Sequence, residues 1–232
     1  MLVAFEGIDG AGKTTQVQLL KERARGLGMQ AEILSFPRYN ETVFARCIAA
    51  YLNGQFGDLA AVPPASAALL YAGDRFESLG KITTMAQAND LLILDRYVAS
   101  NLAHQGAKVP PAARQDFLDW VAGIEYVAFG LPKADITVYL DMPVHLASEL
   151  IHKRKQRSYT ASAADIHEAD TTYLAQCRAV YQMLVEKHTD SAWFMIPCAY
   201  PDDELRGVTE IHEAIWNAIQ DVVCRSEDGP RR

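Results

Sequence analysis

A glycine-rich segment directly follows the first apolar run of the chain. Residues 7–14 read GIDGAGKT and match G-x-x-x-x-G-K-[ST], with a helical apolar period after them. In this context backbone N–H groups can surround a phosphate at a helix N-terminus, where the helix dipole favours anions. Lys13 would reach the β- and γ-phosphates, and the Thr14 hydroxyl would hold Mg²⁺. The segment predicts a nucleoside triphosphate site formed by Gly7, Asp9, Gly10, Ala11, Gly12, Lys13, Thr14 and Thr15.

Composition narrows the class of protein. With 232 residues, half of them apolar, the chain is expected to form one α/β domain. The net charge of −7 argues against a broad nucleic-acid surface. No apolar run approaches the ~20 residues of a membrane span, and the first residues resemble a strand, so a secretory signal is not expected. Four scattered cysteines without metal-ligand spacing are interpreted as reduced residues of a cytoplasmic protein, namely Cys47, Cys177, Cys198 and Cys224.

The chain alternates apolar strands with amphipathic helices. Strands are expected at residues 2–6, 30–36, 91–94, 136–140 and 193–196. Helices are expected at residues 14–27, 43–53, 65–89, 111–127, from 143 onward, and at 208–223. This alternation predicts an α/β fold in which helices cover both faces of a parallel sheet. Ligands bind at the carboxyl ends of such strands, so the segments GIDGAGKT, PRY and DRY, which follow three of them, should converge.

Polar residues at these strand ends suit a phosphate site. Asp9 would face a sugar hydroxyl or a metal-bound water, or stabilise the loop through an Asx hydrogen bond. Pro37 ends the second strand, and Arg38 can then hold a phosphate bidentately, although a lone arginine there is also typical of solvated surface. Asp95 is expected to assist Mg²⁺ and can also cap the next helix. Arg96 adds a second positive group at this place.

Several motifs then occur in a characteristic order. They are EGIDGAGKTT at 6–15, SFPRY at 35–39, AGDR at 72–75, LDRYVASN at 94–101 and a basic segment before Asp165 and Glu168. The set resembles thymidylate kinase of the bacterial type, a P-loop nucleoside monophosphate kinase, over residues 1–184. The resemblance implies a three-layer P-loop NTPase fold with five parallel strands, a single kinase domain at 1–224, a mobile lid at about 153–168 and a polar tail at 225–232.

The resemblance also implies the reaction and its partners. The γ-phosphate of MgATP would pass to dTMP, giving ADP and dTDP for dTTP synthesis, in a cytoplasmic enzyme that forms a homodimer. Arg38 and Arg96 would hold the 5′-phosphate of dTMP, with Tyr39 beside it and Asp9 near the sugar and phosphate.

The base and sugar would meet a second group of residues. Tyr71 would stack on thymine and Arg75, one helical turn later, would bond a base oxygen; core packing is the alternative for Tyr71. His104 departs from the family, which usually has tyrosine or phenylalanine against the sugar. Histidine is smaller and can hydrogen-bond, so the strictness of deoxyribose selection is left open. The other expected dTMP contacts are Phe36, Pro37, Ser100, Asn101 and Glu168.

The basic segment HKRKQRSY at 152–159 resembles the family's lid. Ala11 stands where other members carry a loop arginine, so Arg154 or Arg157 would bring positive charge to the transferring group. A charged run is otherwise typical of a solvated helix face. The expected catalytic residues are therefore Lys13, Arg96, Arg154 and Arg157.

Two other functions remain open. A deoxynucleoside kinase, or another nucleoside monophosphate kinase, would share the phosphate loop. A nucleoside kinase needs a carboxylate base near the 5′-hydroxyl, yet Arg38 follows the second strand and neither Glu32 nor Glu41 is placed obviously for that role. A nucleotide switch would need segments ordered by the γ-phosphate, and the sequence lacks the base-recognition motif N-K-x-D.

Overall fold

Parallel strands form the central sheet of the computed structural model, which describes residues 1–57, 61–157, 170–187 and 192–225. The strands are β1 (Leu2–Glu6), β2 (Ala31–Ser35), β3 (Leu91–Asp95), β4 (Ile136–Asp141) and β5 (Ala192–Pro197). They lie in the order β2-β3-β1-β4-β5, and every neighbouring pair is parallel. The predicted α/β fold with a five-stranded parallel sheet is confirmed.

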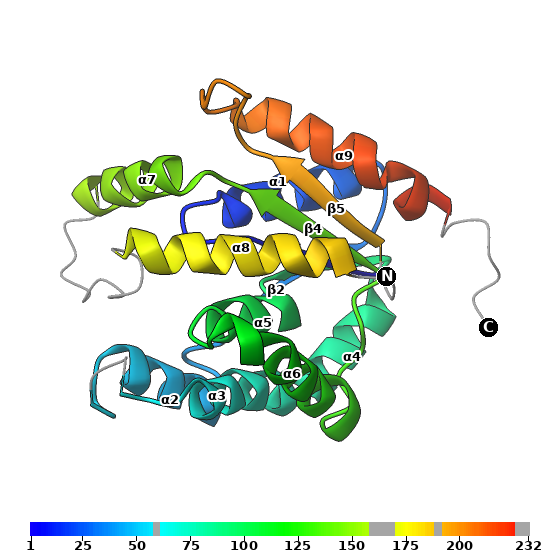
Figure 1. Cartoon of the computed structure of the whole chain (residues 1–232). Helices are drawn as coiled ribbons and strands as arrows, with labels where there is room; N and C mark the ends of the chain where they lie inside the picture. Colours follow the sequence, from blue (N-terminus) through cyan, green and yellow to red (C-terminus); the bar gives the residue numbers. More distant parts are fainter. Residues whose placement is uncertain (58–60, 158–169, 188–191, 226–232) are drawn as a thin grey trace.

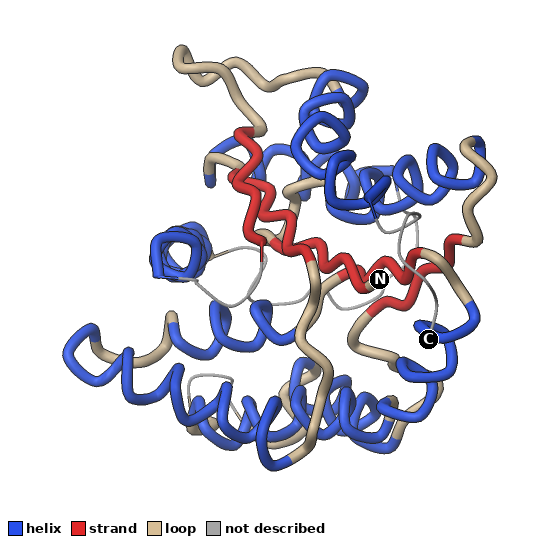
Figure 2. The backbone as a smooth tube through the Cα atoms, turned by 90° about the vertical axis from the view of Figure 1, so that its right-hand side faces the viewer, coloured by secondary structure: helices blue, strands red, loops and turns tan. Residues whose placement is uncertain are grey.

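Helices cover both faces of the sheet (Figures 1 and 2). On one face, α1 (Lys13–Gly26) packs against α9 (Val208–Arg225). The other layer contains α3 (Pro64–Glu77), α4 (Leu79–Ala88), α5 (Val98–Gly106), α6 (Pro111–Ala122) and α8 (Thr171–Lys187), with α2 (Val43–Leu52) packed on α3. After β4, α7 (Val144–Arg157) contacts α8.

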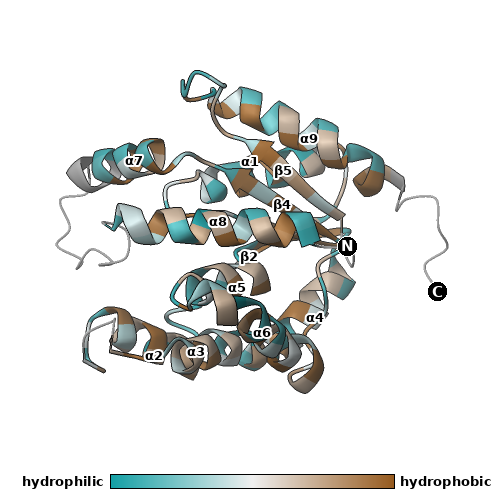
Figure 3. Ribbon diagram, viewed as in Figure 1, coloured by the Kyte–Doolittle hydropathy of each residue, from teal (hydrophilic) through white to brown (hydrophobic). Residues whose placement is uncertain are grey.

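The strands are apolar because helices cover both of their faces. Every residue of β1 and β3 is buried, which explains their continuous hydrophobic runs. In Figure 3, α8 and α9 alternate between hydrophilic and hydrophobic residues, as expected for helices that bury one side. Within the described part of the chain, no helix combines the length and apolar character needed to cross a bilayer.

Strand order brings the sequence motifs together. β1 pairs directly with β3, and Phe5 lies opposite Asp95. The glycine-rich loop after β1 and the residues after β3 therefore leave the sheet side by side. This is the carboxyl edge, where open α/β sheets bind their ligands.

The helix predicted at residues 65–89 is divided into α3 and α4. Ser78 lies at the division, and its hydroxyl donates to the carbonyl of Asp74 at 2.7 Å. Back-bonding of this kind bends helices. The division lets α3 and α4 take separate directions, which the apolar pattern alone does not reveal.

Other boundaries also depend on packing. The helix predicted at residues 111–127 ends as an α-helix at Ala122 and continues as a π-helical turn, Gly123–Ala128. α5 and α8 were not delimited from the sequence, because α5 is buried on most sides and shows no clear amphipathic period. α9 runs through Arg225, one residue into the expected polar tail, and the rest of that tail lies outside the described residues.

Leu92→Ala is expected to lower the free energy of unfolding by about 2–5 kcal/mol, because Leu92 is fully buried in β3 and truncation leaves a cavity. The matched control is Leu27→Ala, whose side chain is 57% exposed and should change stability by about 0.5 kcal/mol or less. Urea unfolding of both variants measures the difference. Equal losses would contradict the central position of β3.

Candidate functional site

The glycine-rich loop turns sharply between β1 and α1. Gly10 has a φ of 80°, a conformation that favours glycine. A Cβ on Gly10 would lie 2.5 Å from the carbonyl oxygen of Ala147, so the backbone of α7 approaches the loop closely. Lys13 donates from Nζ to the carbonyl oxygens of Gly7 at 2.9 Å and Ile8 at 2.8 Å. The loop therefore holds the lysine ammonium against its own backbone.

The charge of Lys13 is sensitive to its surroundings. Burial lowers the pKa of Lys13 to about 8, and the nearby Arg96 acts in the same direction. An anionic ligand at the loop would favour the charged form and raise that pKa.

A hydroxyl and a carboxylate join the loop to the neighbouring strand. Thr14, in the first turn of α1, donates from Oγ1 to Oδ2 of Asp95 at 2.8 Å. Asp95 is the last residue of β3. The two residues predicted to hold a metal are thus brought together, and both offer oxygen atoms, the ligands that Mg²⁺ prefers.

Arg96 turns back toward the loop from the end of β3. Its φ of 67° is a left-handed conformation that is rare outside glycine and often marks functional sites. The guanidinium forms an ion pair with Asp9 and lies 3.2 Å from Ser100 Oγ and 3.4 Å from the Gly7 carbonyl oxygen. Burial opposes the charge, but Asp9 and other nearby acids outweigh it and raise the pKa of Arg96 above its usual range. Arg96 is therefore a permanent cation beside the loop.

A buried carboxylate supports this arginine. Glu6 is completely buried at the end of β1 and accepts hydrogen bonds from Tyr97 N at 2.8 Å, Ser100 Oγ at 2.6 Å and Tyr181 Oη at 3.1 Å. Burial raises the pKa of Glu6, although Ser100 and Arg96 favour its charged form. Ser100 thus bridges Glu6 and Arg96. Glu6 was not predicted as a site residue. The sequence feature that could have identified it is an acidic residue in an otherwise apolar strand.

Two cavities meet at Asp9 and Arg96. The larger, about 720 Å³, extends along the loop from Asp9 to Gln16 and reaches Leu205 and Arg206 before α9. The smaller, about 170 Å³, lies between the end of β2, α3 and α5. Residues that line both are Asp9, Phe36, Pro37, Tyr39 and Arg96. A ligand in one cavity would therefore share a wall with a ligand in the other.

The smaller cavity gathers most of the residues predicted for the acceptor nucleotide. Tyr71 and Arg75 come from α3, whereas Ser100, Asn101 and His104 come from α5. The predicted residues that line it are Asp9, Phe36, Pro37, Tyr39, Tyr71, Arg75, Arg96, Ser100, Asn101 and His104.

Arg38 lines neither cavity. Its Nη1 donates to Ser78 Oγ at 2.8 Å, and its Nη2 pairs with Glu41. Its buried Nε has no partner among the described residues. The flanking Pro37 and Tyr39 do line the smaller cavity, so Arg38 is next to it while its guanidinium is held toward the division between α3 and α4.

His104 is a neutral group in this site. Burial lowers the pKa of His104 to about 3, with Arg96 contributing. Nδ1 lies 3.1 Å from Tyr173 Oη, which itself donates to the His104 carbonyl oxygen at 3.1 Å. Because the guanidinium of Arg96 can only donate, the proton is assigned to Nδ1, which faces Tyr173 Oη and, at 3.7 Å, Cys177 Sγ. Nε2 is left as an acceptor, 3.4 Å from Nη1 of Arg96.

The predicted lid is described only in part. Arg154 and Arg157 belong to α7, but their side chains lie outside the described residues. Asp165 and Glu168 also lie outside them.

Other residues that line the cavities were not predicted. Gln105, Lys108 and Tyr173 line the smaller cavity. Helical spacing could have found Gln105 and Lys108, which lie four residues after Asn101 and His104. Tyr173, Leu205 and Arg206 come from α8 and from the loop before α9, and no motif marks them.

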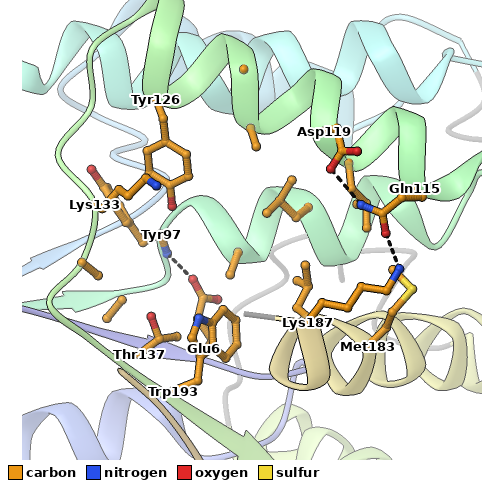
Figure 4. A pocket seen from close by; sticks show the side chains of 18 of the residues that line it. Glu6, Tyr97, Gln115, Asp119, Tyr126, Lys133, Thr137, Met183, Lys187 and Trp193 are labelled. Atoms are coloured by element: carbon orange, nitrogen blue, oxygen red, sulfur yellow. Dashed lines mark hydrogen bonds between the residues drawn. The ribbon is translucent and has the colours of Figure 1, made fainter. Parts of the chain in front are cut away.

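A separate cavity of about 370 Å³ lies between the sheet and α5, α6 and α8. In Figure 4, Glu6 and Tyr126 lie on one part of its wall, and Gln115 lies on another, bonded to Asp119 and Lys187. No residue predicted to bind nucleotide or metal lines it.

Comparison with known proteins identifies the family of this chain. The thymidylate kinase family model matches residues 5–206. A thymidylate kinase of Mycobacterium tuberculosis is 38% identical over 196 residues, 84% of this chain and 91% of that protein. A thymidylate kinase of Chlorobaculum parvum is 31% identical over 237 residues, 100% of both chains. In fold, the chain resembles the solved thymidylate kinase of Candida albicans, with a TM-score of 0.69, 19% identity, and coverage of 95% of this chain and 91% of that one. The chain belongs to the thymidylate kinase family.

Proposed function

We propose that this protein is a dTMP kinase, which transfers the γ-phosphoryl group of ATP to dTMP and releases ADP and dTDP for dTTP synthesis. The observation that carries this proposal is the pair of cavities that meet at Asp9 and Arg96. One contains the phosphate loop, and the other is lined by aromatic and polar groups suited to a nucleoside. Membership of the family supports the same reaction.

The reaction requires no general base from the protein. A phosphate monoester has a second pKa near 6, so the acceptor is mostly dianionic at neutral pH. One of its oxygens attacks the γ-phosphorus as the bond to the β,γ-bridging oxygen breaks, and ADP leaves with that electron pair. Lys13 lines the larger cavity and Arg96 lines both, so these two cations would align the reactants and neutralise charge.

Thr14 and Asp95 fit a Mg²⁺ ion bound with ATP. Their oxygen atoms lie 2.8 Å apart beside the phosphate loop. When bound, the ion would neutralise charge on the ATP phosphates. Thr14 would be its protein ligand, and Asp95 would orient that hydroxyl and the water around the ion.

The acceptor would occupy the smaller cavity. Its phosphate would bind Arg96 and also Arg38, once Arg38 exchanges the exposed Glu41 for the ligand. Asp9 would face the sugar and Tyr71 would stack on the base. The other proposed dTMP contacts are Phe36, Pro37, Tyr39, Arg75, Ser100, Asn101, His104 and Glu168.

The proposal extends to the lid and the assembly. Because Ala11 leaves the loop without an arginine, Arg154 or Arg157 would bring the remaining positive charge to the transferring group. We also propose one kinase domain over residues 1–224, a homodimer, and a cytoplasmic location.

Carboxylates near β2 argue against a nucleoside kinase. Glu32 pairs with Lys21 at 2.8 Å, and Glu41 pairs with Arg38 and with Lys81 at 3.0 Å. Neither acid lines the smaller cavity, and Asp9, the carboxylate that does line it, is paired with Arg96. A kinase acting on a 5′-hydroxyl would need such a base there, so an acceptor that already carries a phosphate is favoured.

A coupled assay of ADP release tests the function. With ATP and Mg²⁺, we expect turnover with dTMP, weaker turnover with dUMP and none with thymidine. Turnover of thymidine but not dTMP would establish a nucleoside kinase. Hydrolysis without any acceptor would support a nucleotide switch.

Affinity for ATP should fall above pH 8. The pKa of Lys13 is about 8 in the free protein and rises when phosphates bind, so binding above this pH takes up a proton. We therefore expect the Kd for ATP to be flat near pH 7 and to rise by up to about tenfold per pH unit between pH 8 and 9.5. Lys13→Ala should bind weakly with no such rise and should not turn over. Calorimetric titration measures Kd, and the same slope in both proteins would contradict this role.

His104→Tyr should sharpen the choice between deoxyribose and ribose. A tyrosine fills space that a 2′-hydroxyl would need and removes the acceptor Nε2. We expect the ratio of kcat/KM for dTMP over its ribose counterpart to rise about tenfold, the size of one lost hydrogen bond with added crowding. The control is His145→Tyr, an exposed residue that lines neither cavity. An unchanged ratio in His104→Tyr would disprove the role.

A further inference from the structure

Glu125 is a fully buried acid that the proposed reaction does not use. It lies in the π-helical turn Gly123–Ala128 after α6 and lines neither nucleotide cavity. Turns of this kind are frequent at functional sites. A buried carboxylate is costly unless it is paired, so its partners indicate its role.

The first partner is Arg75. Its Nε donates to Glu125 Oε2 at 2.7 Å, and its Nη2 pairs with Oε1. Burial opposes the charge of Arg75, which is 2% exposed, but Glu125 outweighs that effect and raises the pKa of Arg75 above its usual range. These contacts use one edge of the planar guanidinium. The opposite edge, with Nη1, can donate to a ligand in the smaller cavity, which Arg75 lines.

The second partner is Asn101. Its Nδ2 donates to Glu125 Oε1 at 2.8 Å and to the Ala68 carbonyl oxygen at 3.0 Å. Both amide hydrogens therefore have acceptors. Oδ1 is buried and has no partner among the described residues. Asn101 also lines the smaller cavity, so it offers a ligand an acceptor and no donor.

The carboxylate of Glu125 holds both side chains. It therefore fixes the positions of a hydrogen-bond donor on Arg75 and an acceptor on Asn101 relative to each other. Thymine presents the complement, with the acceptor O4 next to the donor N3–H. Cytosine presents the reverse, with an amino donor next to the acceptor N3. We propose that Glu125 is a positioning residue that fixes this order and so selects thymine-type bases over cytosine in the acceptor nucleotide. The inference rests on the proposed dTMP kinase function.

Glu125→Gln tests the inference at nearly constant volume. The substitution removes the negative charge that orients Arg75. It also allows the side-chain amide of Asn101 to rotate and exchange the positions of Oδ1 and Nδ2. We expect the KM for dTMP to rise about 10- to 100-fold, as for loss of a charge-assisted hydrogen bond, with kcat within about threefold. The kcat/KM preference for dTMP over dCMP should fall at least about tenfold. The KM for ATP should stay unchanged, because Glu125 lies outside the ATP cavity.

The matched control is Asp141→Asn. Asp141 accepts two hydrogen bonds from Arg178, at 2.7 and 2.9 Å, between β4 and α8, and lines neither nucleotide cavity. It should lower the melting temperature but keep the KM and base preference. If Glu125→Gln does the same, Glu125 is only structural and the inference is wrong.

A second variant keeps the inference testable if Glu125→Gln does not fold. Glu125→Asp keeps the charge on a side chain one methylene shorter, so its carboxylate should no longer reach both partners. The same KM and selectivity criteria apply, and unchanged values in this variant would also overturn the inference. Failure of the unmodified protein to phosphorylate dTMP would instead reject the proposed function.

Discussion

The parallel pairing of β1 with β3 is the constraint on which the site depends. It sets Phe5 opposite Asp95, so the phosphate loop and Arg96 leave the sheet next to each other. Thr14 can then bond Asp95, and Arg96 can pair with Asp9. Without this register, the residues of the two motifs would be separated by the width of a strand or more.

The site contains positively charged side chains although the whole protein is negatively charged. The chain carries a net charge of −7, yet Lys13 and Arg96 both donate to the Gly7 carbonyl oxygen, and Arg96 lines both cavities. Acidic neighbours make this possible, because Asp9 and Glu6 offset the burial of Arg96. The left-handed backbone at Arg96 turns its guanidinium toward the loop. This backbone conformation is strained, and the surrounding hydrogen bonds maintain it.

The base end of the site is built from helices instead of strands. α3 supplies Arg75, α5 supplies Asn101, and the π-helical turn after α6 supplies the carboxylate that joins them. A buried acid with two polar partners is costly to form and costly to disturb. Such a network holds its donors and acceptors in a single arrangement, which is the property that recognition of a base requires.

The resemblance to thymidylate kinase supplied most residues of the smaller cavity, whereas the sequence by itself determined the parallel sheet and the phosphate loop. These depend on contiguous residues, since the loop needs its own glycines and buried strands need apolar runs. Tertiary structure alone decided the rest. Arg38 turns to Ser78 and Glu41, and Glu125 meets Arg75 from 50 positions away in the chain. A weak signal existed, because Glu125 continues the buried face of Leu118 and Val121 at helical spacing. That pattern predicts that Glu125 is buried but does not identify Arg75 as its partner, because the packing of the helices determines the partner.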